Sequence, residues 1–429
     1  MQIDWDDITA EATDLLREYL RIDTSNPPGN EALAVDFIGR ILAREGIAFE
    51  RAESAPGRDN LYARMGPVGG VTLLNHTDVV PVEVQFWDVE PFGGLQHDGM
   101  IWGRGALDMK GMGIIELLVF LLVKRTNLSL RRGLSFLAVA DEEAGSEFGM
   151  TWVQEHRRGW MDTDLVINEG SYGLTGMGGK DTPIFQFSPT EKVPFWLKLT
   201  VHGRPGHGSV PHGDNCAEHL IHALERVTRW ELALRLTPIM RAHVAAMARA
   251  GAPIGTSDKE ILASAARNPA VRARLTNTIS LTTLQSGIKA NVIPAEATAT
   301  LDCRLLPDVD PDAFLADLRK VIDDERVEIG IFNRYEGAAS NLEGEFVTVV
   351  QDVIAEYVEG SQLAPEMTTG FTDSRIYRKE GIQAYGFVPC LVRPEELAGV
   401  HGHNERISVE NLRLGIQVLF EVVRRLCSK

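Results

Sequence analysis

Residues 71–78 read VTLLNHTD, an apolar run typical of a buried strand that ends on a histidine and an aspartate. Residues two apart in an extended strand lie on the same side, so His76 and Asp78 would point together. Similar short apolar runs occupy residues 61–65, 134–140 and 165–168, with helical patterns at 113–124 and 148–156. This alternation predicts an α/β domain with a mostly parallel sheet and helices on both faces.

The pattern changes near Val193. Strand patterns at 195–201, 278–285, 295–304 and 327–332 are interleaved with helical patterns at 215–229 and 311–324. The order β-α-β-β-α-β predicts an inserted α+β unit of ferredoxin-like topology. We therefore expect an α/β domain in two parts, residues 1–192 and 337–429, with an inserted α+β domain at 193–336. The polar, Ala/Arg-rich stretch 236–274 has no clear place in this scheme.

The charge balance excludes several kinds of partner. The 429 residues carry 43 Lys and Arg against 60 Asp and Glu, a formal charge of −17. Nucleic acids and anionic membranes attract basic surfaces, so neither is an expected partner. The four cysteines are scattered, the N-terminal segment lacks a signal-peptide pattern, and the apolar segment 114–123 is too short to span a bilayer. We expect a cytoplasmic protein.

Five places combine acids or imidazoles, most of them at the end of an apolar run. They are His76 with Asp78, Asp108 in GRGALDMKG (103–111), Glu142 and Glu143 in the DEE turn (141–143), Glu169 in LVINEG (165–170), and His401 with His403 in GVHGHNER (399–406). Taken singly, each has an ordinary alternative as a helix cap, a turn or a solvated loop. The glycine-rich segment matches neither a Walker loop nor a GxGxxG fingerprint.

Together these residues point to metal chemistry. In open α/β sheets, ligand sites lie beyond the C-terminal ends of the strands, where several of these side chains would meet. Imidazole and carboxylate ligands without thiolates suit Zn²⁺, Mn²⁺ or Co²⁺. Five candidate ligands, with one acid able to bridge, predict a hydrolase with two metal ions.

At these motifs the chain resembles the dinuclear zinc family of aminoacylase, acetylornithine deacetylase, succinyl-diaminopimelate desuccinylase and glutamate carboxypeptidase. The resemblance runs from about residue 10 to the C-terminus, with the motifs in the family's order. Besides the segments above, the matching pieces are NHTDVVP (75–81), WDVEPFGG (87–94), DEEAGS (141–146), GRPGHGSVPH (203–212), KANVIPAEATATLDCRLLPD (289–308), GFTDSR (370–375) and HGHNER (401–406).

The resemblance implies a role for each residue of the predicted metal site. The implied ligands are His76, Asp108, Glu169, Glu143 and His401, with Asp108 bridging two ions, most simply zinc, with cobalt or manganese as alternatives. Glu142 would be the general base and Asp78 would orient His76. The family's HxxNE pattern selects His401 as the ligand, with His403 as its competitor.

The inserted domain, residues 193–336, resembles the family's lid and dimerisation domain, which would complete the site of the two-part catalytic domain. By the same resemblance, His207 would stabilise the oxyanion in a neighbouring subunit, which implies a homodimer through this domain. Asn291 and Arg304 would hold the substrate, with the arginine on its carboxylate, and Arg375 is a further substrate-binding candidate. The ordinary alternatives are a turn cap for His207, a lid ion pair for Arg304 and a structural ion pair for Arg375.

The expected activity is metal-dependent hydrolysis of an amide or peptide bond next to a free carboxylate of a small substrate. An N-acyl-amino-acid amidohydrolase or a carboxypeptidase fits, and a dipeptidase acting on short peptides is the alternative. A metal-free scaffold protein of the same fold would have lost ligands or the base, and all are in place here. Phosphoryl transfer on the GRGALDMKG loop would need a Lys-Ser/Thr pair, which that loop lacks.

Overall fold

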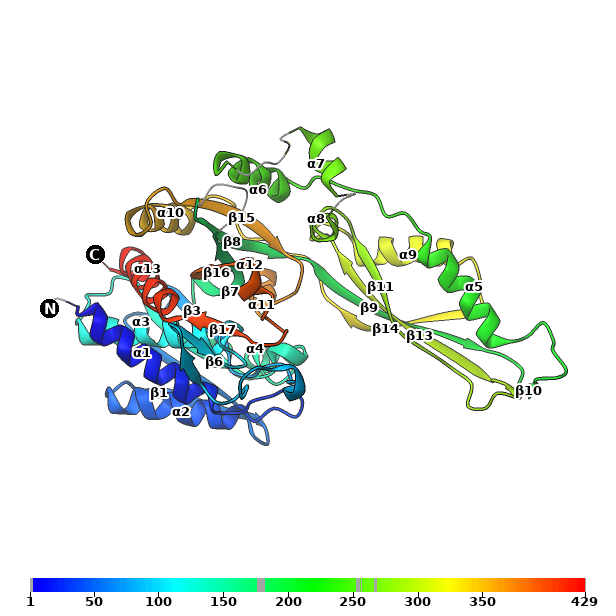
Figure 1. The fold of residues 1–429 in the computed structure, drawn as a ribbon, viewed down its shortest axis with the longest axis horizontal. Helices are drawn as coiled ribbons and strands as arrows, with labels where there is room; N and C mark the ends of the chain where they lie inside the picture. The colour runs from blue at the N-terminus through cyan, green and yellow to red at the C-terminus, as the bar shows by residue number, and fades with distance from the viewer. Residues whose placement is uncertain (1–2, 176–181, 252–254, 256, 266–267, 429) are drawn as a thin grey trace.

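The computed structural model describes residues 3–175, 182–251, 255, 257–265 and 268–428. Its largest element is an eight-stranded sheet in the order β1-β2-β6-β3-β7-β16-β8-β15 (Figure 1). The strands are β1 Phe49–Ala55, β2 Arg58–Met65, β3 Val71–His76, β6 Leu134–Val139, β7 Leu165–Leu174, β8 Ile184–Glu191, β15 Gln362–Thr368 and β16 Gln383–Val392. The neighbours of β3 and the pairs β7–β16 and β8–β15 are parallel, while β1–β2 and β2–β6 are antiparallel. The predicted mostly parallel sheet is confirmed.

Helices cover both faces of this sheet because consecutive residues of each strand point to opposite sides. Leu73 belongs to a core with α1, α2, α3, α10 and α13, whereas Leu74 belongs to another with α4 and α11. These helices are α1 Trp5–Leu20, α2 Glu31–Arg44, α3 Lys110–Arg125, α10 Glu345–Tyr357, α13 Val409–Cys427, α4 Met150–His156 and α11 Ser374–Lys379. Both predicted helical layers are therefore present.

A second sheet, in the order β11-β13-β9-β14, is antiparallel and lies away from the large one (Figure 1). Its strands are β9 Val193–His202, β11 Thr278–Ser286, β13 Glu296–Leu305 and β14 Val327–Arg334. Helices α5 Cys216–Thr228 and α9 Pro311–Ile322 pack on one face, where Leu197 and Leu301 are buried. The sequence order and the pairing are those of a ferredoxin-like unit, as predicted.

The stretch 236–274 contains helices of its own, α6 Pro238–Arg249, α7 Asp258–Ser264 and α8 Pro269–Leu275. Their apolar residues pack on the large sheet: Val244 joins a core with Met367 of β15, and Met247 lies with Ile184 of β8 and Ala364 of β15. In Figure 1, α6 lies beside β15 rather than on the second sheet. By its contacts this part of the range 193–336 belongs with the large sheet, and the three-part division of the chain stays a prediction.

The remaining elements are short and several border the candidate site. They are β4 Leu95–His97, β5 Met100–Trp102, β10 Gly206–His207, β12 Val292–Ile293, β17 Arg406–Ser408, α12 Pro394–Leu397, and the 3₁₀ turns Val84–Phe86, Glu142–Ala144 and Arg158–Met161. No helix in the described ranges is long and apolar enough to cross a membrane.

Candidate metal centre and active site

Acids and imidazoles collect at one edge of the large sheet. His76 is the last residue of β3, Glu142 and Glu143 form the turn after β6, and Glu169 lies within β7. Asp108 lies two residues before α3, and His401 lies in the loop between α12 and β17. The sheet thus gathers side chains that are up to 325 positions apart in sequence, as expected for the C-terminal edge of parallel strands.

Asp108 stands between the two histidines. One of its carboxylate oxygens, Oδ1, lies 3.1 Å from His76 Nε2, and the other, Oδ2, lies 3.1 Å from His401 Nε2. Glu169 Oε1 is 3.5 Å from His76 Nε2, and Glu143 Oε2 is 3.1 Å from His401 Nε2. Two sets of potential ligands, His76–Asp108–Glu169 and Asp108–Glu143–His401, each have all ligand atoms within 4.8 Å of one another.

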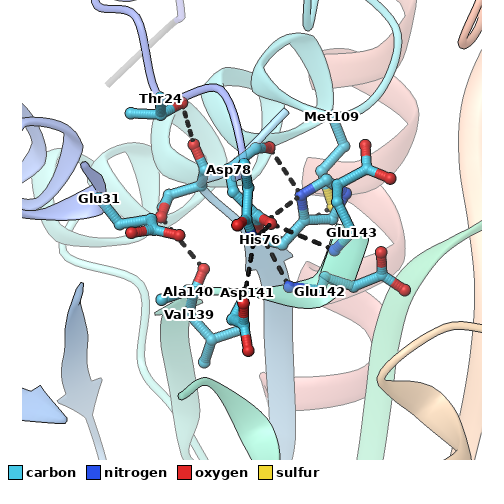
Figure 2. A network of polar contacts seen from close by, with 12 residues as sticks. Thr24, Glu31, His76, Asp78, Met109, Val139, Ala140, Asp141, Glu142 and Glu143 are labelled. Atoms are coloured by element: carbon cyan, nitrogen blue, oxygen red, sulfur yellow. Dashed lines mark hydrogen bonds and ion pairs between the residues drawn. The ribbon is translucent and has the colours of Figure 1, made fainter. Parts of the chain in front are cut away.

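Asp78 lies behind this cluster, fully buried, and fixes two of its parts (Figure 2). Its Oδ1 is 3.4 Å from His76 Nδ1, the ring nitrogen that points away from Asp108. Its two oxygens also accept hydrogen bonds from the backbone N–H groups of Glu142 and Glu143, both at 3.1 Å. Asp78 therefore contacts both the imidazole and the turn that carries the two glutamates.

Burial and mutual repulsion raise the pKa values of the three glutamates in this cluster. Burial raises the pKa of Glu142 well above its usual range, and the charge of Glu169 raises it further. Burial and the charge of Asp108 likewise raise the pKa values of Glu143 and Glu169. Hydrogen bonds with Asp108 and then Glu143 raise the pKa of His401 to about 10.

The residues present fit two divalent cations. Buried oxygens Glu142 Oε1 and Glu143 Oε1 have no hydrogen-bond partner among the described residues. Several carboxylates so close together repel one another unless protons or cations lie between them. An imidazole and carboxylate donor set without thiolate, in which Asp108 belongs to both groups, suits two ions of the Zn²⁺, Mn²⁺ or Co²⁺ kind.

The structure also separates the two competing histidines. His401 Nε2 faces the acids, whereas His403 Nε2 lies 3.4 Å from Glu83 and its ring is 5.1 Å from the ring of Phe86. His403 thus lies on the rim, outside both candidate ligand groups among the described residues.

Sequence reasoning gave no role to Glu405, which the structure places beneath Asp108. This fully buried carboxylate accepts hydrogen bonds from Arg104 Nη1 at 2.7 Å and from the backbone N–H groups of Gly105, Leu107 and Asp108 at 3.0, 2.7 and 2.9 Å. It therefore holds the loop that delivers Asp108. The acid of the HNER segment was the only signal, and its partner Arg104 is 301 positions away.

A second unassigned network holds the DEE turn from the other side. Asp141 has a left-handed backbone with φ 68°, and its Oδ1 accepts hydrogen bonds from Arg58 at 2.7 Å and Asn26 at 2.9 Å. Arg58 also donates to both carboxylate oxygens of Glu31. Buried ion pairs of Arg58 with Asp141 and Glu31 therefore fix the geometry of the turn that carries Glu142.

The structure does not bring His207 and Asn291 to this cluster within one chain. His207 lies in β10 at the tip of the second sheet, far from β3, with its Nδ1 accepting from Ser209 (Figure 1). Gly208 N–H donates to the Asn291 carbonyl at 2.9 Å in the adjoining ribbon. Within the described chain, His207 therefore makes the turn contact that was its ordinary alternative.

Arg304 and Arg375 lie instead where the second sheet meets the large one. Arg304 donates to Asp302 from Nε at 2.8 Å and from Nη2 at 3.2 Å, the lid ion pair considered from the sequence. Arg375 donates from Nη2 to the Gly145 carbonyl at 3.0 Å and to Ser146 Oγ at 3.1 Å, directly after the turn that carries Glu142. Arg375 thus contacts the candidate catalytic turn itself.

Comparison with known proteins agrees with this geometry. The family model "Peptidase family M20/M25/M40" matches residues 72–425. Aminoacylase-1B of Rattus norvegicus is 30% identical over 432 residues, covering 96% of this chain and 95% of the relative. The N-fatty-acyl-amino acid synthase/hydrolase PM20D1 of Mus musculus is 30% identical over 370 residues, covering 82% and 73%.

Solved structures share the fold at lower identity. The di-peptidase Dug1p from Saccharomyces cerevisiae superimposes with a TM-score of 0.72 at 16% identity, covering 98% of this chain and 97% of that one. A dinuclear metal-binding M20 peptidase from Bacillus subtilis gives a TM-score of 0.62 at 15% identity, covering 98% of both chains. The chain described here belongs to peptidase family M20/M25/M40 and is an amidohydrolase or peptidase.

Proposed function

We propose that this chain is a two-metal hydrolase that cleaves an amide bond next to a free carboxylate, with Glu142 as the general base. The observation that carries the proposal is Asp108, whose two oxygens face His76 and His401 in two potential ligand groups. The ligands would be His76, Asp108 and Glu169 for one ion and Asp108, Glu143 and His401 for the other. Two bound ions, most simply Zn²⁺, would make water more acidic and polarise the scissile carbonyl.

The chain's own residues supply the proton transfer. Glu142 is buried beside both ligand groups, and its Oε1 has no partner among the described residues, so it is available to accept a proton. Burial makes a carboxylate a stronger base than an exposed one, which would let Glu142 take up the proton and return it to the leaving amine. Asp78 keeps the Glu142 backbone in place, because its carboxylate accepts the N–H of that residue.

The proposed substrate carries a free carboxylate, which Arg304 would bind. Arg304 Nη1 has no hydrogen-bond partner within the described ranges, and a guanidinium pairs well with a carboxylate. Aminoacylase-1 and the N-fatty-acyl-amino acid synthase/hydrolase, named by their activities, favour an N-acyl amino acid as that substrate. A short peptide is the second candidate, since both would present an amide next to a carboxylate.

We also propose that the active form is a homodimer through the second sheet, in which the partner subunit's His207 stabilises the oxyanion and Asn291 contacts the substrate. Edge strand β11 is exposed along most of its length, and its Leu281 and Leu284 are 41% and 52% exposed. An uncovered edge with apolar side chains favours pairing with a second copy. The charge of −17 disfavours nucleic-acid and anionic-membrane partners, and the four free, buried cysteines favour a cytoplasmic location.

The test is a hydrolysis screen of N-acyl amino acids against dipeptides, with Zn²⁺, Co²⁺ or Mn²⁺ added to metal-stripped protein and released amine as the readout. We expect chelator-sensitive release from N-acyl amino acids. Release from dipeptides alone would favour the second candidate, and a protein that binds no metal and hydrolyses neither class would refute the proposal.

A further inference from the structure

Two arginine side chains pack against the ring of Phe371. The guanidinium carbon of Arg304 lies 5.2 Å from the ring centroid, and that of Arg375 lies 5.0 Å from it. Both distances are within the range of favourable cation–π contacts. Arg304 comes from β13 of the second sheet and Arg375 from α11 beside the large sheet, so one aromatic side chain joins the two parts of the chain at the candidate site.

Other aromatic rings fix the position of Phe371. Trp196 and Tyr335 lie 6.4 and 6.1 Å from it between centroids, and they contact Arg304 and Arg375 respectively. Tyr335 also donates from its hydroxyl to the Gly145 carbonyl at 3.5 Å, next to the turn that carries Glu142. The ring is therefore held between the second sheet and the catalytic turn.

Each arginine keeps a donor without a partner. Two of the three nitrogens of Arg304 are engaged by Asp302, and Nη1 is buried with no hydrogen bond among the described residues. Arg375 uses both terminal nitrogens on Thr372, Gly145 and Ser146, and only its Nε lacks a partner there. A buried donor left unpaired is unfavourable, and a ligand oxygen at Arg304 Nη1 would remove that cost.

The charges around the ring favour an anion. Asp302 faces Arg304, and Asp373 Oδ1 lies 3.8 Å from Arg375 Nη1, so each cation has one acid nearby. The buried Lys192 adds little positive charge at neutral pH, because burial, followed by the charge of Arg304, lowers its pKa to about 7. In a chain with a net charge of −17, two arginines on one ring next to Gly145 are a local concentration of positive charge.

We propose that Phe371 is a positioning residue that sets the specificity for a substrate carboxylate. Its ring holds Arg304 against Trp196 so that Nη1 stays directed to the carboxylate, and it fixes this arginine relative to Arg375 and the catalytic turn. The inference rests on the proposed hydrolysis of substrates with a free carboxylate, and it adds which side chain makes that group a requirement.

The experiment compares Phe371→Leu with wild type on two matched substrates, an N-acetyl amino acid and its C-terminal carboxamide. Leucine keeps the apolar volume but removes the π face. We expect KM for the carboxylate substrate to rise about tenfold, from the loss of two cation–π contacts, with kcat changed less than about twofold. KM for the carboxamide should not change, so the preference for the carboxylate falls by the same factor.

Two further variants separate positioning from general damage. Phe332→Leu is the matched control, because Phe332 is 57% exposed and packs on Trp196 at 5.9 Å without an arginine contact, and it should behave as wild type. Phe371→Tyr keeps the π face and should restore the low KM. Calorimetric binding of the product amino acid provides the same comparison without turnover.

Equal loss on both substrates, or unchanged binding of the carboxylate in Phe371→Leu, would overturn this inference while leaving the hydrolase assignment intact. Absence of metal-dependent hydrolysis in the wild type would refute the proposed function instead. In that case, product binding that is weakened by Phe371→Leu and restored by Phe371→Tyr would still support the carboxylate subsite.

Discussion

Replacing Glu405 by glutamine tests how the fold delivers Asp108. The four donors to this carboxylate are divided equally: Arg104 and Gly105 bond to Oε2, and Leu107 and Asp108 bond to Oε1. A glutamine turns one oxygen into an NH₂ group, so in either orientation two donors would face another donor. Hydrogen bonds to charged groups contribute about 1.5–3 kcal/mol each, and we expect a loss of about 3–5 kcal/mol in the free energy of unfolding.

The same change should weaken metal binding. The N–H of Asp108 is one of the four donors, so its loop would shift and the carboxylate between the two histidines would move with it. Loss of an outer partner of this kind typically costs about 10–100-fold in metal affinity or activity. The effect on metal should therefore accompany the effect on stability.

The assay is urea unfolding of metal-stripped protein, followed by zinc titration of the folded protein. Glu395→Gln is the control, because Glu395 is an exposed glutamate in α12, ten residues before Glu405. We expect the control to stay within about 0.5 kcal/mol of wild type. A Glu405→Gln variant that matches the control in both stability and zinc affinity would refute the positioning role.

Three further predictions follow from the site and its surroundings. His401→Ala should abolish binding of one metal ion per chain, as measured by elemental analysis. His403→Ala should retain the full metal content, because the ring of His403 packs near Phe86, outside both ligand groups of the described residues. The reverse result would exchange the roles of the two histidines. Asp78→Asn would set an NH₂ group against a backbone N–H of the catalytic turn and should lower kcat/KM by about 10–100-fold, and an unchanged value would contradict its positioning role. Burial lowers the pKa of Lys192 to about 7, so between about pH 7 and 10.5 the unfolded chain binds more protons at this residue and stability rises with pH, by about 5 kcal/mol at most. Lys192→Met should lose this rise when urea unfolding is compared at pH 7 and 9.5, whereas identical pH dependence would refute the lowered pKa.

The large sheet was predictable where its strands are apolar and end in polar residues. The run before His76 shows both features, and the structure places β3 at the centre of the sheet. Strand β1 was missed because FERAESA is an exposed edge strand with one buried residue, Ala52. Strand β15 was missed because Pro365 interrupts its pattern, which a strand tolerates at the edge of a sheet.

The candidate site was predictable in its ligands but not in its supports. His76, Asp108 and Glu169 belong to motifs whose residue types predict a metal site, and the structure brings these three side chains together. Glu405 and Arg104 are ordinary residues in the sequence, because only the fold makes their contact across 301 positions. The contacts of Phe371 with two arginines are likewise created by packing between the two sheets.

The central claim is that one cluster holds two metal ions while Glu142 moves the proton. Its most direct test measures bound metal and turnover together in the wild type and in Glu142→Gln. We predict close to two ions per chain in both proteins, with turnover of the N-acyl amino acid reduced at least about 100-fold in the variant. A variant that retains full turnover, or a wild-type protein that hydrolyses this substrate without bound metal, would contradict the account.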